Sequence, residues 1–341
     1  MYSTPSSSSC PSYGSSITHI FPMRAAVADG GKGWSAATQG SYQFAAILVS
    51  IAFGILTAAL FRFLTKPNAN IELTLLVCAI PVFSIGLIED LTKKISVRTR
   101  LLFTAIGALL AICFLETTIT SLGIPVVDYL LGFPPIAIVF TIFAVTGLSN
   151  AYNIIDGFNG LSSMVGIIAL MAIGYVSYVL ADPLILYLCF VMIAAILGFF
   201  VWNFPRGLIF LGDGGAYLIG FWVGILSIML VSRNPKVSPW FAFLINIYPI
   251  FETIFSIWRK KIFKKISPGT PDGVHLHMLI YGRIARWLKV DNPKKGFLSN
   301  ARTSPYLWKL SCLATAPAII FWNNTPALIV FATLFCISYL A

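Results

Sequence analysis

The segment Gly147 to Leu161, GLSNAYNIIDGFNGL, places polar side chains at the end of a long apolar run. The polar residues recur at every third position: Asn150, Asn153, Asp156 and Asn159. If the segment is helical, this spacing brings the last three close together along one side, where their oxygens could converge on a ligand. Two glycines in the segment would let a phosphate group or another backbone come close. The alternative is a polar helix end followed by a glycine-containing turn.

A second group of charged residues follows another apolar run, in GLIEDLTKKISVRTR, residues 86–100. Glu89 and Asp90 are adjacent, and Lys93 follows within one helical turn. Two carboxylates at close range raise each other's affinity for a cation or a proton, so the pair could bind magnesium or act as a base. The alternative is a solvated helix end whose acids pair with the lysines.

Asp213 lies between glycines at the entrance to a third apolar run, with Phe210 three residues upstream. A carboxylate at the centre of a membrane helix costs roughly 2.5 to 3.5 kcal/mol on insertion scales, and it needs a partner even near the interface. A divalent cation would satisfy this carboxylate, and the glycines would leave room for phosphates. The alternative is a helix N-cap, a position that Asp fills well.

A fourth group, SPGTPDGVHLHMLIYGR at 267–283, contains Asp272, His275 and His277. Histidines two positions apart share one face of an extended segment but not of a helix. Because no cysteine lies near them, hydrogen bonds from imidazole to a phosphate or a sugar nucleotide are favoured over a zinc site. The alternative is an ordinary pair of loop residues.

The composition places these groups in an integral membrane protein. Hydrophobic residues make up 58% of the chain and charged residues only 10%, and the mean hydropathy is +0.87, far outside the range of soluble domains. The six cysteines are widely spaced and mostly lie in apolar runs, so we interpret them as buried hydrophobic residues. The net charge of +11 does not indicate nucleic acid, because the charges sort by membrane face.

Membrane-spanning helices must position the four groups. Residues 1–42 are rich in Ser, Gly and Ala and predict a disordered N-terminal tail. Residues 43–341 predict an all-α bundle of about ten transmembrane helices. The predicted spans are about 43–64, 71–88, 101–116, 133–152, 160–181, 183–203, 215–231, 238–257, 306–322 and 325–341.

This order places all four groups at one membrane face, because the loops after every second span open on the same side. Of the 23 Lys and Arg residues, only Arg62, Lys66, Arg233 and Lys236 fall on the other face. The positive-inside bias therefore makes the face with the groups cytoplasmic. The longest loop there, 258–305, begins WRKKIFKK and could attract anionic lipid head groups or a polyphosphate, or serve only as a basic anchor.

Acids that can bind magnesium, cations that can hold phosphate oxygens and a broad apolar wall meet the requirements of phosphoryl transfer to a lipid. The four motifs, in this order, resemble those of the polyprenyl-phosphate N-acetylhexosamine-1-phosphate transferase family: IEDLTKKISVRTR, NAYNIIDGFNGL, FLGDGGAYLIGF and SPGTPDGVHLH. The resemblance covers about residues 70–285. The HLH sequence is more similar to the branch that initiates O-antigen and common-antigen synthesis than to the peptidoglycan branch.

The resemblance implies a magnesium-dependent phosphotransferase, with Mn²⁺ as the alternative ion. It would move an N-acetylhexosamine 1-phosphate from a UDP-sugar to undecaprenyl phosphate and release UMP, which starts a lipid-linked glycan of the cell surface. Its expected location is the bacterial inner membrane, with several spans and a cytoplasmic active site. Its expected partners are the two substrates and membrane lipids, not nucleic acid, and a homodimer is left open.

The motifs and the resemblance together assign the candidate site residues. Glu89, Asp90 and Asp156 are the candidate catalytic residues, and Asn153 and Asp213 are the candidate metal ligands. In the family pattern, Phe210 resembles an aromatic residue that stacks on uracil. The candidate substrate-binding residues are Lys93, Asn150, Asn159, Phe210, Asp272, His275 and His277.

Three departures from the family pattern leave other functions open. Glu89 replaces the usual Asp and adds a methylene, and Asn159 replaces a second Asp and so loses a charge. The family's first span and the glycine-rich loop after it have no clear counterpart, and residues 1–42 stand in their place. One alternative is a catalytically impaired paralogue that binds the lipid phosphate. Another is a transporter of an anionic substrate, although polar groups at one face and the lack of an internal repeat argue against it.

Overall fold

The computed structural model describes residues 69–264, 275–287 and 293–340, and every regular element within these ranges is a helix. The predicted all-α class is therefore confirmed for the described residues. Three predicted features lie outside them: the tail 1–42, the span 43–64 and Asp272.

Local sequence signals set many of the helix bounds. Proline begins several helices, because the first turn of a helix does not need the missing N–H. Ser96 and Asp182 each cap the helix that follows them with their side chains. The helices are α3 (Ala69–Thr92), α4 (Val97–Leu115), α5 (Pro125–Leu131), α6 (Pro134–Ile155), α7 (Leu161–Val179), α8 (Pro183–Asn203), α9 (Gly212–Arg233), α10 (Pro239–Ile245), α11 (Ile247–Arg259), the π-helical η1 (Lys260–Lys264), α12 (Leu276–Trp287), α13 (Pro293–Ile320) and α14 (Thr325–Leu340).

Six described helices are long and apolar enough to cross a membrane: α3, α4, α6, α7, α8 and α9. The predicted span 238–257 is instead a pair of helices, α10 and α11, bent by 72°. Asn246 lies at the bend with non-helical backbone angles and accepts a hydrogen bond from the Tyr152 hydroxyl, so the chain breaks at a buried polar residue. The predicted number of about ten spans is thus not confirmed, since the described residues contain six, or seven if the bent pair is one span.

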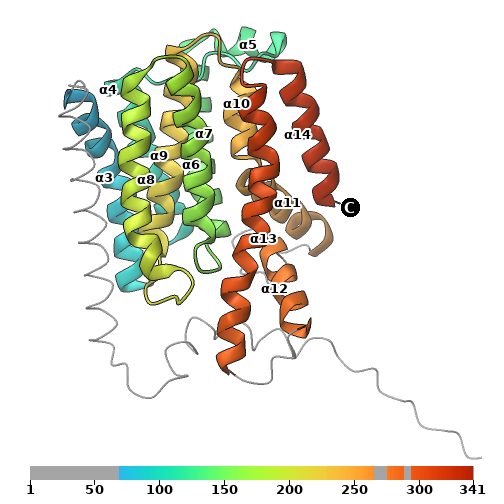
Figure 1. Ribbon diagram of the computed structural model, residues 1–341. Coiled ribbons are helices and arrows are strands. Elements are labelled where there is room, and N and C mark those ends of the chain that lie inside the picture. The colour runs from blue at the N-terminus through green and yellow to red at the C-terminus, as the bar shows by residue number, and fades with distance from the viewer. Residues whose placement is uncertain (1–68, 265–274, 288–292, 341) are drawn as a thin grey trace, which may run out of the picture.

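The segment predicted as a long loop, 258–305, contains helical structure. It includes η1, α12 and the first part of α13, a helix of 28 residues that begins well before the predicted span 306–322. The sequence of the first turns of α13 is polar, so the sequence alone indicates that these residues belong to the loop and not to the helix. The described parts of this region therefore form a helical extension of the bundle (Figure 1).

Helix α9 is the most buried of the spans. In its most apolar stretch 83% of the residues are buried, against 28% in α4. Glycines let two neighbours approach it closely. A Cβ at Gly220 would lie 2.6 Å from the Cα of Ser149 in α6, and a Cβ at Gly86 in α3 would overlap the backbone of Gly214. Helices α3 and α6, which carry two of the polar motifs, are therefore held at backbone distance from α9, which carries the third.

The polar motifs lie at one end of the bundle, as the loop order predicts. The end of α3, the α6–α7 loop and the α8–α9 loop all lie at the lower edge of the bundle in Figure 1, and α12 lies below α11 at the same end. Which side of the membrane this end faces stays a prediction from the positive-inside bias.

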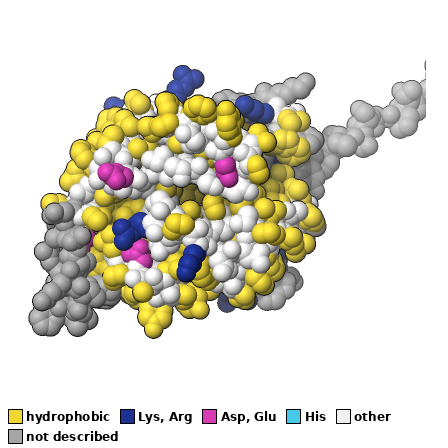
Figure 2. All heavy atoms as spheres, turned by 90° about the horizontal axis from the view of Figure 1, so that it is seen from above, with side chains coloured by type: hydrophobic (Ala, Val, Ile, Leu, Met, Phe, Trp, Pro, Cys, Tyr) yellow, Lys and Arg dark blue, Asp and Glu magenta, His cyan; other side chains and the backbone are white. Residues whose placement is uncertain are grey.

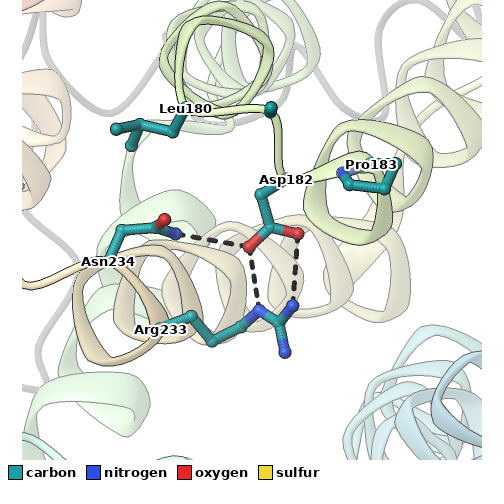
Figure 3. A pocket seen from close by; sticks show the side chains of 6 residues that line it. Leu180, Asp182, Pro183, Arg233 and Asn234 are labelled. Atoms are coloured by element: carbon teal, nitrogen blue, oxygen red, sulfur yellow. Dashed lines mark hydrogen bonds and ion pairs between the residues drawn. The ribbon is translucent and has the colours of Figure 1, made fainter.

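The opposite end carries an ion pair between helix ends. Figure 2 shows this face, where apolar side chains surround scattered charged ones. Asp182, before α8, accepts hydrogen bonds from Arg233 Nε at 2.9 Å and from the Asn234 amide (Figure 3), and these residues line a pocket of about 490 Å³. Burial raises the pKa of Asp182, but the bonds and charge of Arg233 outweigh it and hold this pKa below its usual value. The carboxylate thus joins α8 to α9.

Candidate active site

Asp90 joins the end of α3 to the beginning of α9. Its Oδ1 accepts the backbone N–H of Asp213 at 3.0 Å, and its Oδ2 accepts that of Gly214, also at 3.0 Å. These amides belong to the first turn of α9, which has no partner for them within the helix. Gly212 has a φ of +70°, and a Cβ there would overlap the Asp90 carboxylate. The carboxylate therefore caps α9 and brings the first and third motifs together.

The side chain of Asp213 pairs with Arg100 of α4. Nη1 of Arg100 contacts Oδ2 of Asp213, and the two side chains are only 13% and 10% exposed. The guanidinium carbon also lies 5.9 Å from the centre of the Tyr217 ring. Within the described residues, Nε of Arg100 is buried and has no hydrogen-bond partner. Arg100 therefore neutralises the buried carboxylate and keeps one buried donor that a further acceptor could use.

Tyr217 connects this ion pair to the second motif. Its hydroxyl donates a hydrogen bond to Oδ1 of Asn150 in α6 at 3.0 Å. Asn153, one helical turn further along α6, and Glu89 of α3 are also near enough to interact with this hydroxyl. Four helices thus converge on one group of side chains, which we call the polar cluster: Glu89, Asp90, Arg100, Asn150, Asn153, Asp213 and Tyr217.

The two adjacent acids of the first motif have different surroundings. Asp90 has both oxygens on backbone amides of α9. Glu89 accepts one backbone N–H, that of Ile95 in the α3–α4 turn, through Oε2 at 2.7 Å. Lys93 has a side chain that is 59% exposed, with Nζ 3.2 Å from Oδ1 of Asp90. The structure therefore brings Lys93 to the edge of the polar cluster and leaves Glu89 with the less committed carboxylate.

Of the two alternatives for the second motif, the structure has the polar helix end followed by a glycine-containing turn, so Asn153, Asp156 and Asn159 do not share one side of a helix. Helix α6 ends at Ile155, and Asp156 is its cap residue. Gly160 has a φ of +70°, a left-handed conformation that favours glycine, so the chain turns around Asn159 rather than continuing the helix. Asn153 consequently stays in the polar cluster, whereas Asn159 leaves it.

Asn159 is 5% exposed and makes its contacts elsewhere. Its N–H donates to Oδ1 of Asn300 at 3.0 Å, its carbonyl accepts from Oγ of Ser304 at 2.6 Å, and its side-chain amide donates to the carbonyl of Pro205 at 3.3 Å. Trp308 donates its indole N–H to the carbonyl of Gly160 at 3.0 Å. One face of α13 thus holds this loop, and a substrate contact of Asn159 stays a prediction.

The rings of His275 and His277 are stacked, with centroids 5.2 Å apart and planes 2° from parallel. His277 is 3% exposed and packs against Phe158 and Gly157 of the α6–α7 loop. Burial lowers the pKa of His277 to about 4, so this ring is neutral at pH 7. His275 places Nδ1 2.8 Å from Oε1 of Glu252 in α11. The histidines therefore join α11 and α12 to the loop of the second motif.

The remaining predicted site residues are less enclosed. Asp156 is half-buried at the end of α6, and Phe210 is half-buried two residues before α9. Both lie at the same end of the bundle as the polar cluster. Asp272 lies outside the described residues, so its role stays a prediction.

Sequence reasoning gave no role in the site to three residues that the structure places in or beside it: Arg100, Tyr217 and Glu252. Arg100 is a cation in the first turn of an apolar span, and Tyr217 follows Asp213 by one helical turn. Glu252 stands alone among apolar residues in IYPIFETIF. An apolar helix tolerates each of these polar groups only with a partner. An isolated polar residue in an apolar run is therefore the sequence signal by which they could have been identified.

The fold and the site define a class of protein, namely multi-pass α-helical membrane proteins with a polar, partly buried group of side chains at one end of the bundle. Residues 72–231 match the profile of Glycosyl transferase family 4. This range contains the whole polar cluster.

The chain is also similar to named transferases. It is 29% identical over 209 residues to an undecaprenyl-phosphate alpha-N-acetylglucosaminyl 1-phosphate transferase of Thermotoga maritima, covering 61% of this chain and 62% of that protein. It is 31% identical over 219 residues to the Escherichia coli K12 protein of the same name, covering 63% and 58%. It is 29% identical over 259 residues to a phospho-N-acetylmuramoyl-pentapeptide-transferase of Staphylococcus epidermidis, covering 72% and 77%.

The match therefore spans about three fifths of the length of the first two relatives. Within the matched residues, the chain is similar to the polyprenyl-phosphate N-acetylhexosamine-1-phosphate transferases.

Proposed function

We propose that this protein transfers an N-acetylhexosamine 1-phosphate from a UDP-sugar to undecaprenyl phosphate and releases UMP. The observation that carries the proposal is the polar cluster, in which side chains of three separate motifs meet at one end of a membrane bundle. The names of the relatives indicate the lipid acceptor and the sugar 1-phosphate. The product would start a lipid-linked cell-surface glycan, for which O-antigen is our candidate.

The proposed reaction exchanges one phosphoanhydride bond for another. An oxygen of the lipid phosphate attacks the phosphorus that carries the sugar, and the bond from this phosphorus to the bridging oxygen of UMP breaks. A new pyrophosphate then links lipid and sugar, and UMP leaves with the bridging oxygen. Several negatively charged phosphates must come together, so catalysis depends on positioning and on neutralising charge.

Glu89 is our candidate for the group that keeps the lipid phosphate deprotonated. Asp90 uses both oxygens to fix the first turn of α9, which makes it a residue that places Asp213. Glu89 has one oxygen on the Ile95 N–H and another that could accept a proton. A phosphate monoester has its second pKa near 6, so only a small fraction of the lipid phosphate needs this help at pH 7.

Arg100 and Lys93 are the candidate phosphate-binding cations. The buried Nε donor of Arg100 could bind a phosphate oxygen while the guanidinium still faces Asp213. Lys93 is exposed at the edge of the cluster, where a long flexible amine can reach a substrate that enters from solvent. Together they would spread the charge that develops during transfer.

The side-chain oxygens in the polar cluster fit a magnesium ion. Asp213 would hold it with a carboxylate and Asn153 with an amide oxygen, and Mg²⁺ commonly takes one or two carboxylates, with substrate phosphates and water as its other ligands. Within the described residues, no three His, Cys, Asp or Glu side chains could hold a metal by themselves, so the substrate phosphates would have to complete its shell. When bound, the ion would supply positive charge to the pyrophosphate. Mn²⁺ is the alternative ion.

The reaction can be tested with purified protein, undecaprenyl phosphate and a panel of UDP-N-acetylhexosamines, with Mg²⁺, with Mn²⁺ and with EDTA. We expect UMP release and a lipid product heavier by one N-acetylhexosamine phosphate, and we expect neither with EDTA. Asp213→Asn should lower turnover by about 100-fold or more. The control Glu116→Gln changes an exposed acid at the far end of α4 and should be as active as the unmodified protein.

Two results would oppose the proposal. One is the absence of lipid product with every UDP-sugar in the panel. The other is normal turnover of Asp213→Asn, which would remove Asp213 from the metal site. A location in the bacterial inner membrane with the site on the cytoplasmic face is part of the same proposal, and labelling of a cysteine introduced at Lys93 from either side of the membrane tests it.

A further inference from the structure

Glu252 is a buried acid for which the proposed reaction has no role. It lies in α11 and is 1% exposed, within an otherwise apolar stretch. An ionised carboxylate at this burial carries a large desolvation cost unless donors surround it. Its partners therefore indicate why the chain keeps an acid at this position.

Three hydrogen-bond donors, from the beginning of α12 and from α14, contact the carboxylate of Glu252. Oε1 lies 2.8 Å from Nδ1 of His275 and accepts the N–H of Leu276 at 3.3 Å. Oε2 accepts the hydroxyl of Tyr339 near the end of α14. The same carboxylate therefore holds the beginning of α12 and the end of α14, and both of its oxygens are used.

This arrangement selects one form of the His275 ring. A carboxylate can only accept, so Nδ1 must carry the proton that it shares with Oε1. The other ring nitrogen, Nε2, is then the one available to a ligand. The stacked ring of His277 restricts rotation of His275, which leaves its ring with both a fixed tautomer and a fixed plane.

We propose that Glu252 is a positioning residue that acts through His275 on the binding of the nucleotide-sugar donor, with Tyr339 holding the carboxylate in place. The proposal rests on the proposed function, because it takes the donor as the ligand of His275. According to this proposal, helix α14 contributes to recognition of the nucleotide-sugar, although α14 lies far from the polar cluster in the chain.

Steady-state kinetics separate this role from a general loss of structure. Glu252→Ala should raise KM for the UDP-sugar by about tenfold or more and change kcat by less than about threefold, because binding rather than chemistry is affected. Glu252→Gln keeps an oxygen for Nδ1 and for Leu276, so its KM should stay within about threefold of the unmodified value. In the His275→Ala background, Glu252→Ala should have no further effect, since the residue through which it acts is gone.

A matched control exists at the other end of the bundle. Glu72 in α3 also accepts a tyrosine hydroxyl, that of Tyr187, at 2.8 Å. Glu72→Ala should therefore leave KM unchanged, although it removes a comparable bond. The proposal is overturned if Glu252→Ala lowers kcat alone, if Glu252→Gln is as impaired as Glu252→Ala, or if the effects of Glu252→Ala and His275→Ala add.

A second measurement does not depend on the reaction. The chain has three histidines, so ¹⁵N-histidine labelling gives few signals, and His275→Ala assigns the one of interest. We expect a protonated Nδ1 on His275 in the unmodified protein and in Glu252→Gln, and its loss in Glu252→Ala. An unchanged signal in Glu252→Ala overturns the inference. Absence of UMP formation in the unmodified protein, with this signal present, refutes the proposed function and leaves the His275 geometry standing.

Discussion

The guanidinium of Arg100 pairs with the carboxylate of Asp213, which lies 113 residues farther along the chain. Both side chains are mostly buried at the end of a membrane bundle, where a single unpaired charge would be costly. The pair explains how the bundle tolerates Asp213. It also places a cation beside the carboxylate that we propose to bind the metal.

Replacing Arg100 should separate its charge from its geometry. Arg100→Lys keeps the charge without the planar fork and should lower kcat by roughly tenfold, and Arg100→Met should lower it by about 100-fold or more. Arg100→Met also leaves Asp213 buried without a partner, at a cost of about 3 to 5 kcal/mol in stability. UMP release and the Tm in detergent measure the two effects.

The double variant Arg100→Met with Asp213→Asn provides the control for that experiment. It removes both charges, so its Tm should return toward that of the unmodified protein while UMP release stays lost. A double variant with restored turnover would contradict a catalytic role for the pair.

Glu89 and Asp90 should respond differently to loss of charge. Asp90→Asn has one acceptor oxygen for two backbone amides, so one amide of α9 loses its partner, at a cost of about 1 to 3 kcal/mol. Glu89→Gln can still accept the Ile95 N–H, so its Tm should be unchanged, while kcat falls by about 100-fold or more. Thermal unfolding and turnover of both variants test this difference, and an equal loss of Tm in the two would contradict it.

The close approach of α6 and α9 requires glycine at position 220. A Cβ there would lie 2.6 Å from the Cα of Ser149, and backbone atoms cannot move aside as a flexible side chain can. Gly220→Ala should therefore lower stability by about 1 to 3 kcal/mol. Gly147→Ala, in α6 with no atom within 4 Å of a new Cβ, should leave stability unchanged or raise it by about 0.5 to 1 kcal/mol. Equal Tm values for the two variants would count against this packing.

Stability should fall on acidification because His277 is buried in its neutral form. Its pKa is about 4 in the folded protein against 6.5 for an ordinary histidine. Above pH 6.5 neither state binds the proton, whereas between pH 6.5 and 4 only the unfolded state does, so stability is lost over this window. The loss at pH 5 is about 2 kcal/mol.

The variant His277→Gln tests this titration. It cannot bind the proton, so the fall in Tm between pH 7.5 and pH 5 should be smaller in the variant than in the unmodified protein. An identical fall in both would assign the acid sensitivity to other groups.

Local patterns predicted the parts of the site that depend on nearby residues. The apolar runs located α3, α4, α6, α7, α8 and α9 closely, and the order of the spans placed Glu89, Asn153 and Asp213 at the same end of the bundle. The same patterns could not find the break at Asn246. In the sequence, Asn246 is a single polar residue within an apolar run, and such a run does not indicate whether the helix continues or bends. They also left open whether the segment up to Asn159 is helical or is a helix end followed by a turn, and the left-handed Gly160 shows that the chain turns there.

By itself, the sequence determined that this is an all-α membrane protein, which polar residues need partners and which family it resembles. Composition and residue spacing are sufficient for the first two conclusions, because the cost of a charge in an apolar helix does not depend on the identity of its partner. The resemblance rests on the four motifs. Only the tertiary structure decided which partners meet. It paired Asp213 with Arg100, used Asp90 as a cap for α9 and joined Glu252 to His275 and Tyr339. These contacts depend on how helices distant in the chain pack, and spacing along one helix carries no information about that packing.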